Sequence, residues 1–365
     1  MEAEHSLSFG GNEVPSRRAV HLLVMFTLCL CGLVAVGCGG DDDSSSGGSS
    51  SSQSTPEAKK IKVGLVTDIG GLNDRSFNQL ANEGLERAKS ELGVDGRVLT
   101  SSKNSDYVPN LSSLAQQKYD LVIGVGFLMA EAVETVANKF PDTKFAIIDY
   151  SQAAMKSKPA NVDGLLFKEN EAGYLVGTLA ALYTKDKGGD QVISSVGGQK
   201  IPPVDSYIAG YQAGAKKANP DIKTLNGYSE DFVKQDLCKE LALNQIAEGS
   251  QVVFQVAGQC GLGALDAAKE KGVVGIGVDA DQGYLGAHVM TSALKRVDVA
   301  VYTAISAAKS GKLAGGTDAS FGAKVDGVGY GKWSPKVSYA IRNAVAAQYK
   351  LLKAGKIKGI PATVK

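Results

Sequence analysis

The sequence is poor in the side chains that metal centres and hydrolytic active sites most often use. It has three histidines in 365 residues, and two of them, His5 and His21, lie near the N-terminus. Only His288 falls in the part expected to fold, which argues against a histidine-rich zinc site and leaves one candidate base for a Ser/His/Asp triad. A lone histidine is more often a structural residue. The sequence therefore predicts no catalytic residue, no metal site and no cofactor.

Phosphate-binding motifs and a charge excess are missing as well. The sequence contains neither GxGxxG nor GxxxxGK[ST], the two glycine-rich loops that hold dinucleotides and nucleotide phosphates. Residues 1–37 carry two arginines and three glutamates, so the remainder has 37 basic and 35 acidic residues and a formal net charge of +2. A balance so close to zero gives no electrostatic reason to bind nucleic acid. We therefore expect no nucleic-acid partner.

Cysteine is scarce in the part expected to fold. Of five cysteines, Cys29, Cys31 and Cys38 belong to the N-terminal apolar segment, and only Cys238 and Cys260 remain. In an oxidising compartment two remaining cysteines can pair, and two buried free thiols are the alternative. The sequence leaves both possibilities open.

The N-terminal segment has the pattern of an export signal. Arg17 and Arg18 precede an uncharged apolar run over residues 19–36, which ends in Ala-Val-Gly-Cys at Cys38. This pattern predicts a lipoprotein signal peptide over 1–37, with Cys38 as the lipidated first residue of the mature chain. Two alternatives stay open, an uncleaved membrane anchor and a twin-arginine signal. Each of them exports the folded part, so we expect an extracytoplasmic protein held at the cell membrane.

A polar linker follows that cysteine. Residues 39–56 read GGDDDSSSGGSSSSQSTP and contain no apolar side chain able to join a core. A serine- and glycine-rich stretch of 18 residues is a flexible tether with an r.m.s. reach on the order of 20 to 25 Å. We assign residues 38–57 to this tether.

From residue 61 onward, short apolar strands alternate with amphipathic helices in two sets of similar rhythm. This alternation predicts an α/β fold with parallel sheets covered by helices on both faces, arranged as two lobes with a cleft between them. Strands are expected at 61–67, 96–100, 120–125, 144–148, 163–167, 191–196, 222–228, 251–255, 274–278 and 288–293. Helices are expected at 76–92, 108–117, 128–140, 169–183, 204–218, 233–248 and 261–271.

Polar and aromatic side chains follow the predicted strands. Asp68, Asp149 and Asp279 each come directly after one strand, and Phe232 and Gly258 follow two others. Because ligands of α/β proteins bind at the carboxyl ends of parallel strands, we expect these residues to meet in one site. A carboxylate in this position can also be a helix cap or a turn residue. The occurrence of three carboxylates together with aromatic residues favours a ligand site.

The loop after the first strand is the most informative stretch. Asp68 and Asn73 offer hydrogen-bond acceptors, and Phe77 offers one aromatic ring. Two carboxylates in this loop, at Asp68 and Asp74, would repel a phosphate at the helix N-terminus. The loop therefore suits a neutral, planar ligand that forms hydrogen bonds.

Five successive stretches of the chain resemble the basic membrane lipoprotein family. They are VGLVTDIGGLNDRSFNQLANEGL, IGVGFLMAEAVETVANKFPDTKFAIIDY, LLFKENEAGYLVGTLA, QVAGQCGLGALDAAKEKGVVGIGVDADQ and VMTSALKRVD. The resemblance runs from about residue 58 to the C-terminus in the order of the family's own blocks. Members of this family are extracytoplasmic solute-binding proteins of ABC transporters, and characterised members bind purine nucleosides. The resemblance thus implies a two-lobed fold of the periplasmic-binding-protein type I class.

The resemblance also implies roles for single residues. Phe77 and Phe232 match the family's aromatic positions that stack on the two faces of the purine base. Asp279 and Lys295 match positions associated with the sugar hydroxyls, where a carboxylate accepts two hydroxyl protons and the ammonium neutralises it. The remaining expected ligand contacts come from Asp68, Asn73 and Asp149 in the first lobe and from the backbone at Gly258.

The expected function is capture of a nucleoside by lobe closure and its delivery to an ABC transporter permease, by a monomer without enzymatic activity. Alternatives are another small ligand such as a sugar, or an exported nucleoside hydrolase that holds a metal at Asp68 and Asp74. The expected domain boundaries are 1–37 for the signal peptide, 38–57 for the tether, 58–168 plus about 294–325 for the first lobe, and 169–293 plus about 326–365 for the second.

Overall fold

The structure, a computed structural model, describes residues 60–364. The predicted signal peptide, the lipidation site Cys38 and the tether lie outside the described residues. Residues 60–364 belong to one compact unit. Within the described part, none of the helices combines the length and the apolar character that a membrane span requires.

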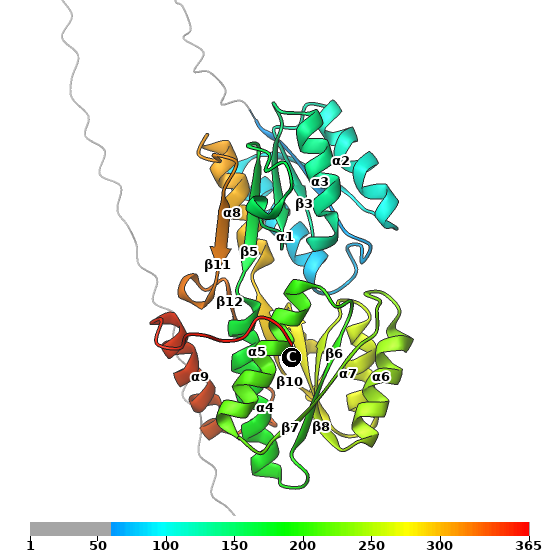
Figure 1. The fold of residues 1–365 in the computed structure, drawn as a ribbon, viewed down its shortest axis with the longest axis vertical. Coiled ribbons are helices and arrows are strands. Elements are labelled where there is room, and N and C mark those ends of the chain that lie inside the picture. Colours follow the sequence, from blue (N-terminus) through cyan, green and yellow to red (C-terminus); the bar gives the residue numbers. More distant parts are fainter. Residues whose placement is uncertain (1–59, 365) are drawn as a thin grey trace, which may run out of the picture. The chain divides into compact units, whose positions relative to one another are not determined.

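The first lobe is built on a six-stranded parallel sheet in the order β11-β5-β4-β3-β1-β2 (Figure 1). Its apolar strands are buried on both faces because helices cover both sides. The strands are β1 (Lys62–Val66), β2 (Asp95–Leu99), β3 (Leu121–Gly124), β4 (Lys144–Ile148), β5 (Val162–Phe167) and β11 (Asp318–Phe321). The helices of this lobe are α1 (Phe77–Leu92), α2 (Tyr107–Gln116), α3 (Ala130–Lys139) and α8 (Val297–Lys309).

The second lobe repeats this arrangement in the order β12-β10-β9-β8-β6-β7, with β12 antiparallel to β10. Its strands are β6 (Val192–Gly197), β7 (Lys223–Tyr228), β8 (Ser250–Val256), β9 (Val274–Asp279), β10 (Val289–Lys295) and β12 (Val328–Tyr330). Its helices are α4 (Glu169–Lys187), α5 (Pro202–Ala218), α6 (Gln235–Ala247), α7 (Gly261–Glu270) and α9 (Tyr339–Lys353). The α/β fold with two lobes, predicted from the sequence, is confirmed.

The chain passes between the two sheets three times. It leaves the first sheet after β5, returns after β10, and leaves again between β11 and β12. Each strand and helix expected from the sequence is present, with ends shifted by a few residues. The residue limits that we gave for the lobes stay a prediction, although these crossings fall near 168, 295 and 325.

The helices α4 and α5 form the tightest helix pair of the second lobe. A Cβ atom added at Gly177 of α4 would lie 1.9 Å from the backbone oxygen of Tyr211, and one added at Gly214 of α5 would lie 2.0 Å from that of Tyr174. Only glycine permits this approach of two helix backbones. The pair therefore has a fixed position, and it carries two side chains of the site described below.

Candidate functional site

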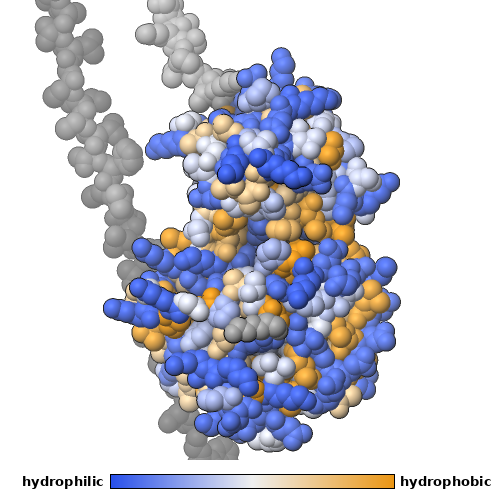
Figure 2. Space-filling model, viewed as in Figure 1, coloured by the Kyte–Doolittle hydropathy of each residue, from blue (hydrophilic) through white to orange (hydrophobic). Residues whose placement is uncertain are grey.

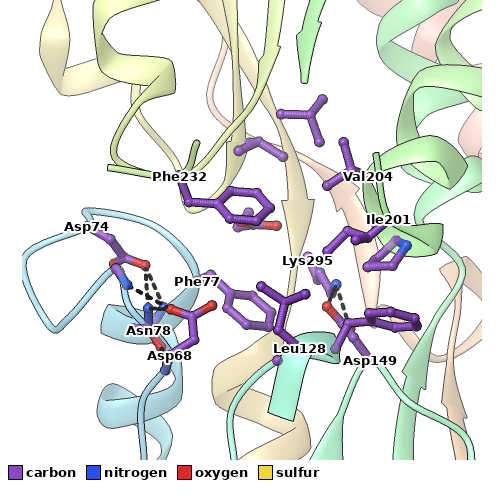
Figure 3. A pocket seen from close by; sticks show the side chains of 18 of the residues that line it. Asp68, Asp74, Phe77, Asn78, Leu128, Asp149, Ile201, Val204, Phe232 and Lys295 are labelled. Carbon is purple, nitrogen blue, oxygen red and sulfur yellow. Dashed lines mark hydrogen bonds and ion pairs between the residues drawn. The ribbon is translucent and has the colours of Figure 1, made fainter. Parts of the chain in front are cut away.

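The carboxyl ends of the strands in both lobes meet around one cavity, with about 660 Å³ of space between its atoms when the open solvent at its mouth is included. In Figure 3, Asp68, Asp74 and Asn78 lie on one side of it, and the aliphatic Leu128, Ile201 and Val204 lie on the other side together with the Asp149–Lys295 ion pair. Residues that line it are Asp68, Gly70, Asp74, Phe77, Asn78, Gly126, Phe127, Leu128, Asp149, Ile201, Pro203, Val204, Tyr207, Phe232, Val256, Gly258, Gln259, Val278, Asp279 and Lys295.

One aromatic ring reaches the cavity from each lobe. Phe77 begins α1 in the first lobe and Phe232 follows β7 in the second, and the two rings lie one above the other in Figure 3. Each ring rests against a glycine that follows a strand. A Cβ atom added at Gly126 would lie 3.4 Å from the Phe77 ring, and one added at Gly198 would lie 2.3 Å from the Phe232 ring. Both rings can therefore face the same space.

A buried ammonium group occupies one wall of the cavity. The Lys295 Nζ lies 2.7 Å from both carboxylate oxygens of Asp149 and 3.0 Å from Glu169 Oε1. Burial alone would lower the pKa of Lys295, but the charges of Asp149, Glu169 and Asp279 raise it above its ordinary value. Burial raises the pKa of Glu169 to about 7 against the opposing effect of Lys295. The ammonium is therefore the stable charge of this cluster.

The same ammonium lies among three aromatic rings. It is 5.1 Å from the ring centroid of Phe77, 4.9 Å from that of Phe167 and 6.0 Å from that of Tyr207. Rings at this distance stabilise a cation through their negative faces. Lys295 thus fixes the ring that we expect to stack on a ligand, besides its contacts with carboxylates.

Asp279 forms hydrogen bonds across the two lobes. Its Oδ2 accepts a bond of 2.8 Å from the Ser76 hydroxyl in the first lobe, and its Oδ1 accepts one of 3.1 Å from the Tyr207 hydroxyl. Burial raises the pKa of Asp279 to about 6, opposed by the charge of Lys295. The ion-pair partners of Lys295 are Asp149 and Glu169, whereas Asp279 feels its charge without a direct ion pair, and the shared sugar role of Asp279 and Lys295 stays a prediction.

Asp68 has one carboxylate oxygen occupied and one available. Its Oδ1 accepts a bond of 2.6 Å from Asn78 Nδ2 and one of 3.0 Å from the Gly70 backbone N–H. Within residues 60–364, the structure gives Oδ2 no hydrogen-bond donor. Burial raises the pKa of Asp68 above its ordinary value. Its Oδ2 is thus a free acceptor at the edge of the cavity.

Asn73, which we expected in the site, is exposed and does not line the cavity. It borders a separate surface groove instead. The next residue, Asp74, takes the inward place because its carboxylate accepts the backbone N–H groups of Ser76, Asn78 and Gln79 at the start of α1. Burial raises the pKa of Asp74 to about 6. In this loop Asp74, and not Asn73, lines the cavity, and the ligand role expected for Asn73 stays a prediction.

The carboxylates Asp149 and Asp279 occupy equivalent places in the two lobes. Asp149 directly follows β4 and Asp279 ends β9, the fourth strand of each half, and each has a left-handed backbone, with φ of 70° and 58°. Aspartate adopts this conformation more readily than most residues, at some cost. Two such positions at one cavity indicate that the turns serve to aim the carboxylates inward.

Glu169 and Tyr207 belong to the site although the sequence analysis did not select them. Glu169 is the first residue of α4, and Tyr207 lies one turn into α5. The glycine-mediated packing of these two helices brings both side chains to Lys295 and Asp279. Glu169 follows a predicted strand, so the strand-end rule applied to Asp68 could have found it. Tyr207 carries no comparable signal.

A disulfide joins two helices of the second lobe whose preceding loops reach the cavity. It links Cys238 in α6 to Cys260 at the start of α7, with the Cα atoms 5.6 Å apart. The backbone N–H of Cys260 donates to the Phe232 oxygen at 3.0 Å. The bond thus connects the segment with Phe232 to the segment with Gly258.

The described residues contain no group of three or more His, Cys, Asp or Glu side chains that could hold a metal ion. His288 is buried away from the cavity lining, and burial lowers its pKa. The arrangement of the site is therefore one of acceptors, rings and a single ammonium.

A family model described as ABC transporter substrate-binding protein PnrA-like matches residues 61–360. An uncharacterized lipoprotein of Pyrococcus abyssi is 38% identical over 290 residues, which cover 76% of this chain and 70% of the relative. A protein of Lactococcus lactis named ABC transporter nucleoside-binding protein BmpA is 34% identical over 308 residues, which cover 78% of this chain and 85% of the relative.

Solved structures show the same architecture. An ABC transporter solute-binding protein from Aeropyrum pernix superposes with a TM-score of 0.74 and 31% identity, covering 82% of this chain and 94% of the other. A second solute-binding protein, from Conexibacter woesei, has a TM-score of 0.67 and 25% identity, over 83% of this chain and 100% of the other. The fold is that of the type I periplasmic binding proteins.

Proposed function

Because the chain belongs to the Bmp family of ABC transporter substrate-binding proteins, we propose that its ligand is a nucleoside, with a purine as the base. The protein captures the nucleoside outside the cytoplasm and delivers it to the permease of an ABC transporter. It binds without chemical turnover. The relative from Lactococcus lactis, named a nucleoside-binding protein, supports this choice of ligand.

The observation that carries the proposal is the pair of rings from opposite lobes. Phe77 and Phe232 reach one cavity, so closure of the lobes around a flat heterocycle covers both of its faces. Stacking on aromatic side chains contributes roughly 1 to 3 kcal/mol per base. A sugar alone offers no flat aromatic face, and a pair of rings is better matched to a base.

The polar groups suit the other two parts of a nucleoside. Asp68 Oδ2 is a free acceptor for an N–H group on the edge of the base. Asp149, Asp279 and Lys295 lie together near the rings, and carboxylates accept the protons of vicinal sugar hydroxyls while the ammonium donates. Gly258 lines the same cavity without a side chain, so its backbone can approach the ligand.

Localisation follows from the N-terminal sequence. We propose that the signal peptide over 1–37 is removed, that Cys38 carries the lipid, and that residues 38–57 tether the folded part to the outer face of the cell membrane. Relatives named lipoproteins support this proposal. The protein works as a monomer, with the permease as its macromolecular partner.

Isothermal titration of residues 39–365 with adenosine, guanosine, inosine, adenine and free ribose tests the function. We expect heat with the nucleosides and none with ribose. Binding of ribose as tight as that of adenosine would overturn the base sandwich and leave a sugar-binding protein. Release of free adenine during incubation with adenosine would overturn the assignment as a binding protein and indicate a hydrolase.

A further inference from the structure

Positive charge is concentrated at the C-terminal end of the chain. Residues 324–365 contain nine lysines and arginines and one acidic residue, Asp326, whereas residues 58–323 contain 28 basic and 30 acidic residues. The overall net charge of +1 hides this separation. The folded part therefore consists of a slightly acidic body and a strongly basic C-terminal segment.

The longest element of this segment, α9, lies on one outer side of the second lobe. The helix α9 packs on α4 and on the short helix η5 (Ala323–Val325), and it lies at the periphery in Figure 1. Lys353 pairs with Asp326 at 2.6 Å, and the Tyr349 hydroxyl donates to the same carboxylate at 2.7 Å. The one carboxylate of the segment is therefore neutralised by its own neighbours.

The other lysines of the segment have no such partners. Within residues 60–364, six exposed lysines of the segment form no ion pair with a carboxylate. We call them, together with the outer face of α9, the C-terminal basic surface. These lysines are Lys324, Lys332, Lys336, Lys350, Lys356 and Lys358.

Apolar side chains stand exposed among these lysines. Tyr339 is 78% exposed and Leu351 42% exposed on the outer face of α9, and Val325 of η5 is 57% exposed. The opposite face of α9 buries Ile341 and Val345. Figure 2 shows hydrophilic and hydrophobic surface interspersed over the side of the second lobe where Figure 1 draws α9. Lysines beside exposed aromatic and aliphatic groups are typical of helices that lie on a lipid surface.

We propose that the C-terminal basic surface docks on the anionic phospholipid headgroups of the membrane. The six lysines supply diffuse attraction, and Tyr339 and Leu351 insert between headgroups. Lysine is depleted from protein–protein interfaces, and Arg342, the one arginine of the segment, already donates to the backbone oxygens of Ser334 and Val337. These two observations favour a lipid surface over an acidic protein.

The tether makes the membrane the nearest anionic surface. If Cys38 carries a lipid, residues 39–57 keep the folded part within a few tens of ångströms of headgroups. Docking leaves the ligand site uncovered, because none of the residues that line the cavity comes from the segment 324–364. The inference depends on neither the identity of the ligand nor the stacking by Phe77.

Vesicle co-sedimentation of residues 39–365, without the lipid, tests the proposal. The vesicles are phosphatidylcholine alone or an equal mixture with phosphatidylglycerol. The test variant replaces four lysines of the surface by glutamine, Lys324, Lys332, Lys350 and Lys356. The matched control makes the same charge change on four exposed lysines of the body, Lys118, Lys158, Lys217 and Lys223.

We expect the unmodified protein and the control to bind the mixed vesicles and to dissociate from them as the salt concentration rises. Neither protein should bind vesicles of phosphatidylcholine alone. The test variant should bind on the order of 100-fold more weakly, because each lysine near an anionic surface contributes about 1 kcal/mol before screening. Melting curves by circular dichroism should show all three proteins folded.

Three outcomes would overturn the proposal. Equal losses in the test and control variants would mean that only net charge matters. Failure of the unmodified protein to bind the mixed vesicles would remove the membrane as a partner. Binding to soluble polyphosphate but not to the vesicles would indicate an anionic polymer as the partner instead.

Discussion

The loops after β1 and β6 occupy equivalent places in the two lobes, but the first presents acidic side chains to the cavity and the second presents apolar ones. The two strands have equivalent positions in their sheets, because β1 lies between β2 and β3 and β6 lies between β7 and β8. The loop after β1 presents Asp68 and Asp74 to the cavity. The segment after β6 presents Ile201 from the loop and Pro203 and Val204 from the first turn of α5. Its lysine, Lys200, is exposed and lies over the Tyr228 ring instead.

At these two loops the cavity therefore has an acidic edge and an apolar edge, and the Asp149–Lys295 ion pair lies beside the apolar one. The repeated architecture places a loop at each sheet edge, and the sequence of each loop decides what that edge offers to a ligand. We expect a ligand with hydrogen-bonding groups along one edge to direct that edge toward Asp68 and Asp74. The four predictions that follow test this asymmetry and are ordered from the largest expected effect to the smallest.

Val204→Asp should remove the asymmetry and with it the binding of nucleosides. Val204 is buried at the cavity, so the new carboxylate would lose its hydration without an ion-pair partner. We expect a loss of affinity on the order of 1,000-fold by isothermal titration, together with a lower melting temperature. Lys200→Asp, on the exposed side of the same loop, is the control and should bind normally. Normal binding by Val204→Asp would show that the apolar side is not needed.

Phe77→Ala and Phe232→Ala test whether the two lobes contribute equally to stacking. Each variant should weaken adenosine binding by about 10 to 100-fold, because each removes one face of the sandwich. Phe140→Ala removes a partly buried ring that does not line the cavity and serves as the control. An unchanged affinity for either cavity variant would remove that ring from the site and leave stacking to the other lobe.

Asp279→Asn tests whether Asp279 contributes to binding of the sugar and not of the base. Asparagine keeps one acceptor for the Ser76 hydroxyl but loses the charge that strengthens hydrogen bonds to sugar hydroxyls. We expect about tenfold weaker binding of adenosine and little change for adenine. Asp281→Asn, two residues away and outside the cavity lining, controls for charge. Equal losses for nucleoside and base would contradict a sugar role for Asp279.

Glu169→Gln tests the pH dependence that the buried cluster imposes. The pKa of Glu169 is about 7 in the folded protein and near 4.5 in the unfolded chain. At a pH between these two pKa values, Glu169 is protonated in the folded protein and deprotonated in the unfolded chain. The contribution of Glu169 to the free energy of unfolding therefore declines as the pH rises from about 4.5 to about 7.

Glutamine cannot titrate, so the variant should lack this decline. We would measure urea unfolding of both proteins at several pH values. The free energy of unfolding of the variant minus that of the unmodified protein should increase with pH across this range and stay constant below and above it. Parallel curves for the two proteins would mean that Glu169 titrates alike in both states.

Much of this site could be predicted because the strands are strongly apolar and end sharply. The residues that were predicted from their place after a strand and that line the cavity are Asp68, Asp149, Asp279, Gly258 and Phe232. The family resemblance added Lys295 and the aromatic role of Phe77. Site residues can be predicted from their positions after strands because a parallel sheet brings the carboxyl ends of all its strands to one edge, whatever the sequence of the loops.

The remaining features depend on contacts that a single sequence does not encode locally. Asn73 and Asp74 are adjacent in an irregular loop, and hydrogen bonds to the start of α1 decide which of them turns inward. Tyr207 reaches Asp279 only because glycines let α4 and α5 approach closely. Lys295 pairs with Glu169 at the start of α4 and with Asp149 after β4 of the other lobe, and these segments lie far apart in the sequence.

The three passages of the chain between the sheets have a consequence for the order of events during capture. Glu169 directly follows the first passage and Lys295 directly precedes the second, so their ion pair lies where a rotation of one lobe against the other displaces atoms least. The charged end of the pocket should thus remain assembled while the protein is open. We expect the pentose to engage this pre-formed end first, and the second ring to arrive only as the halves come together.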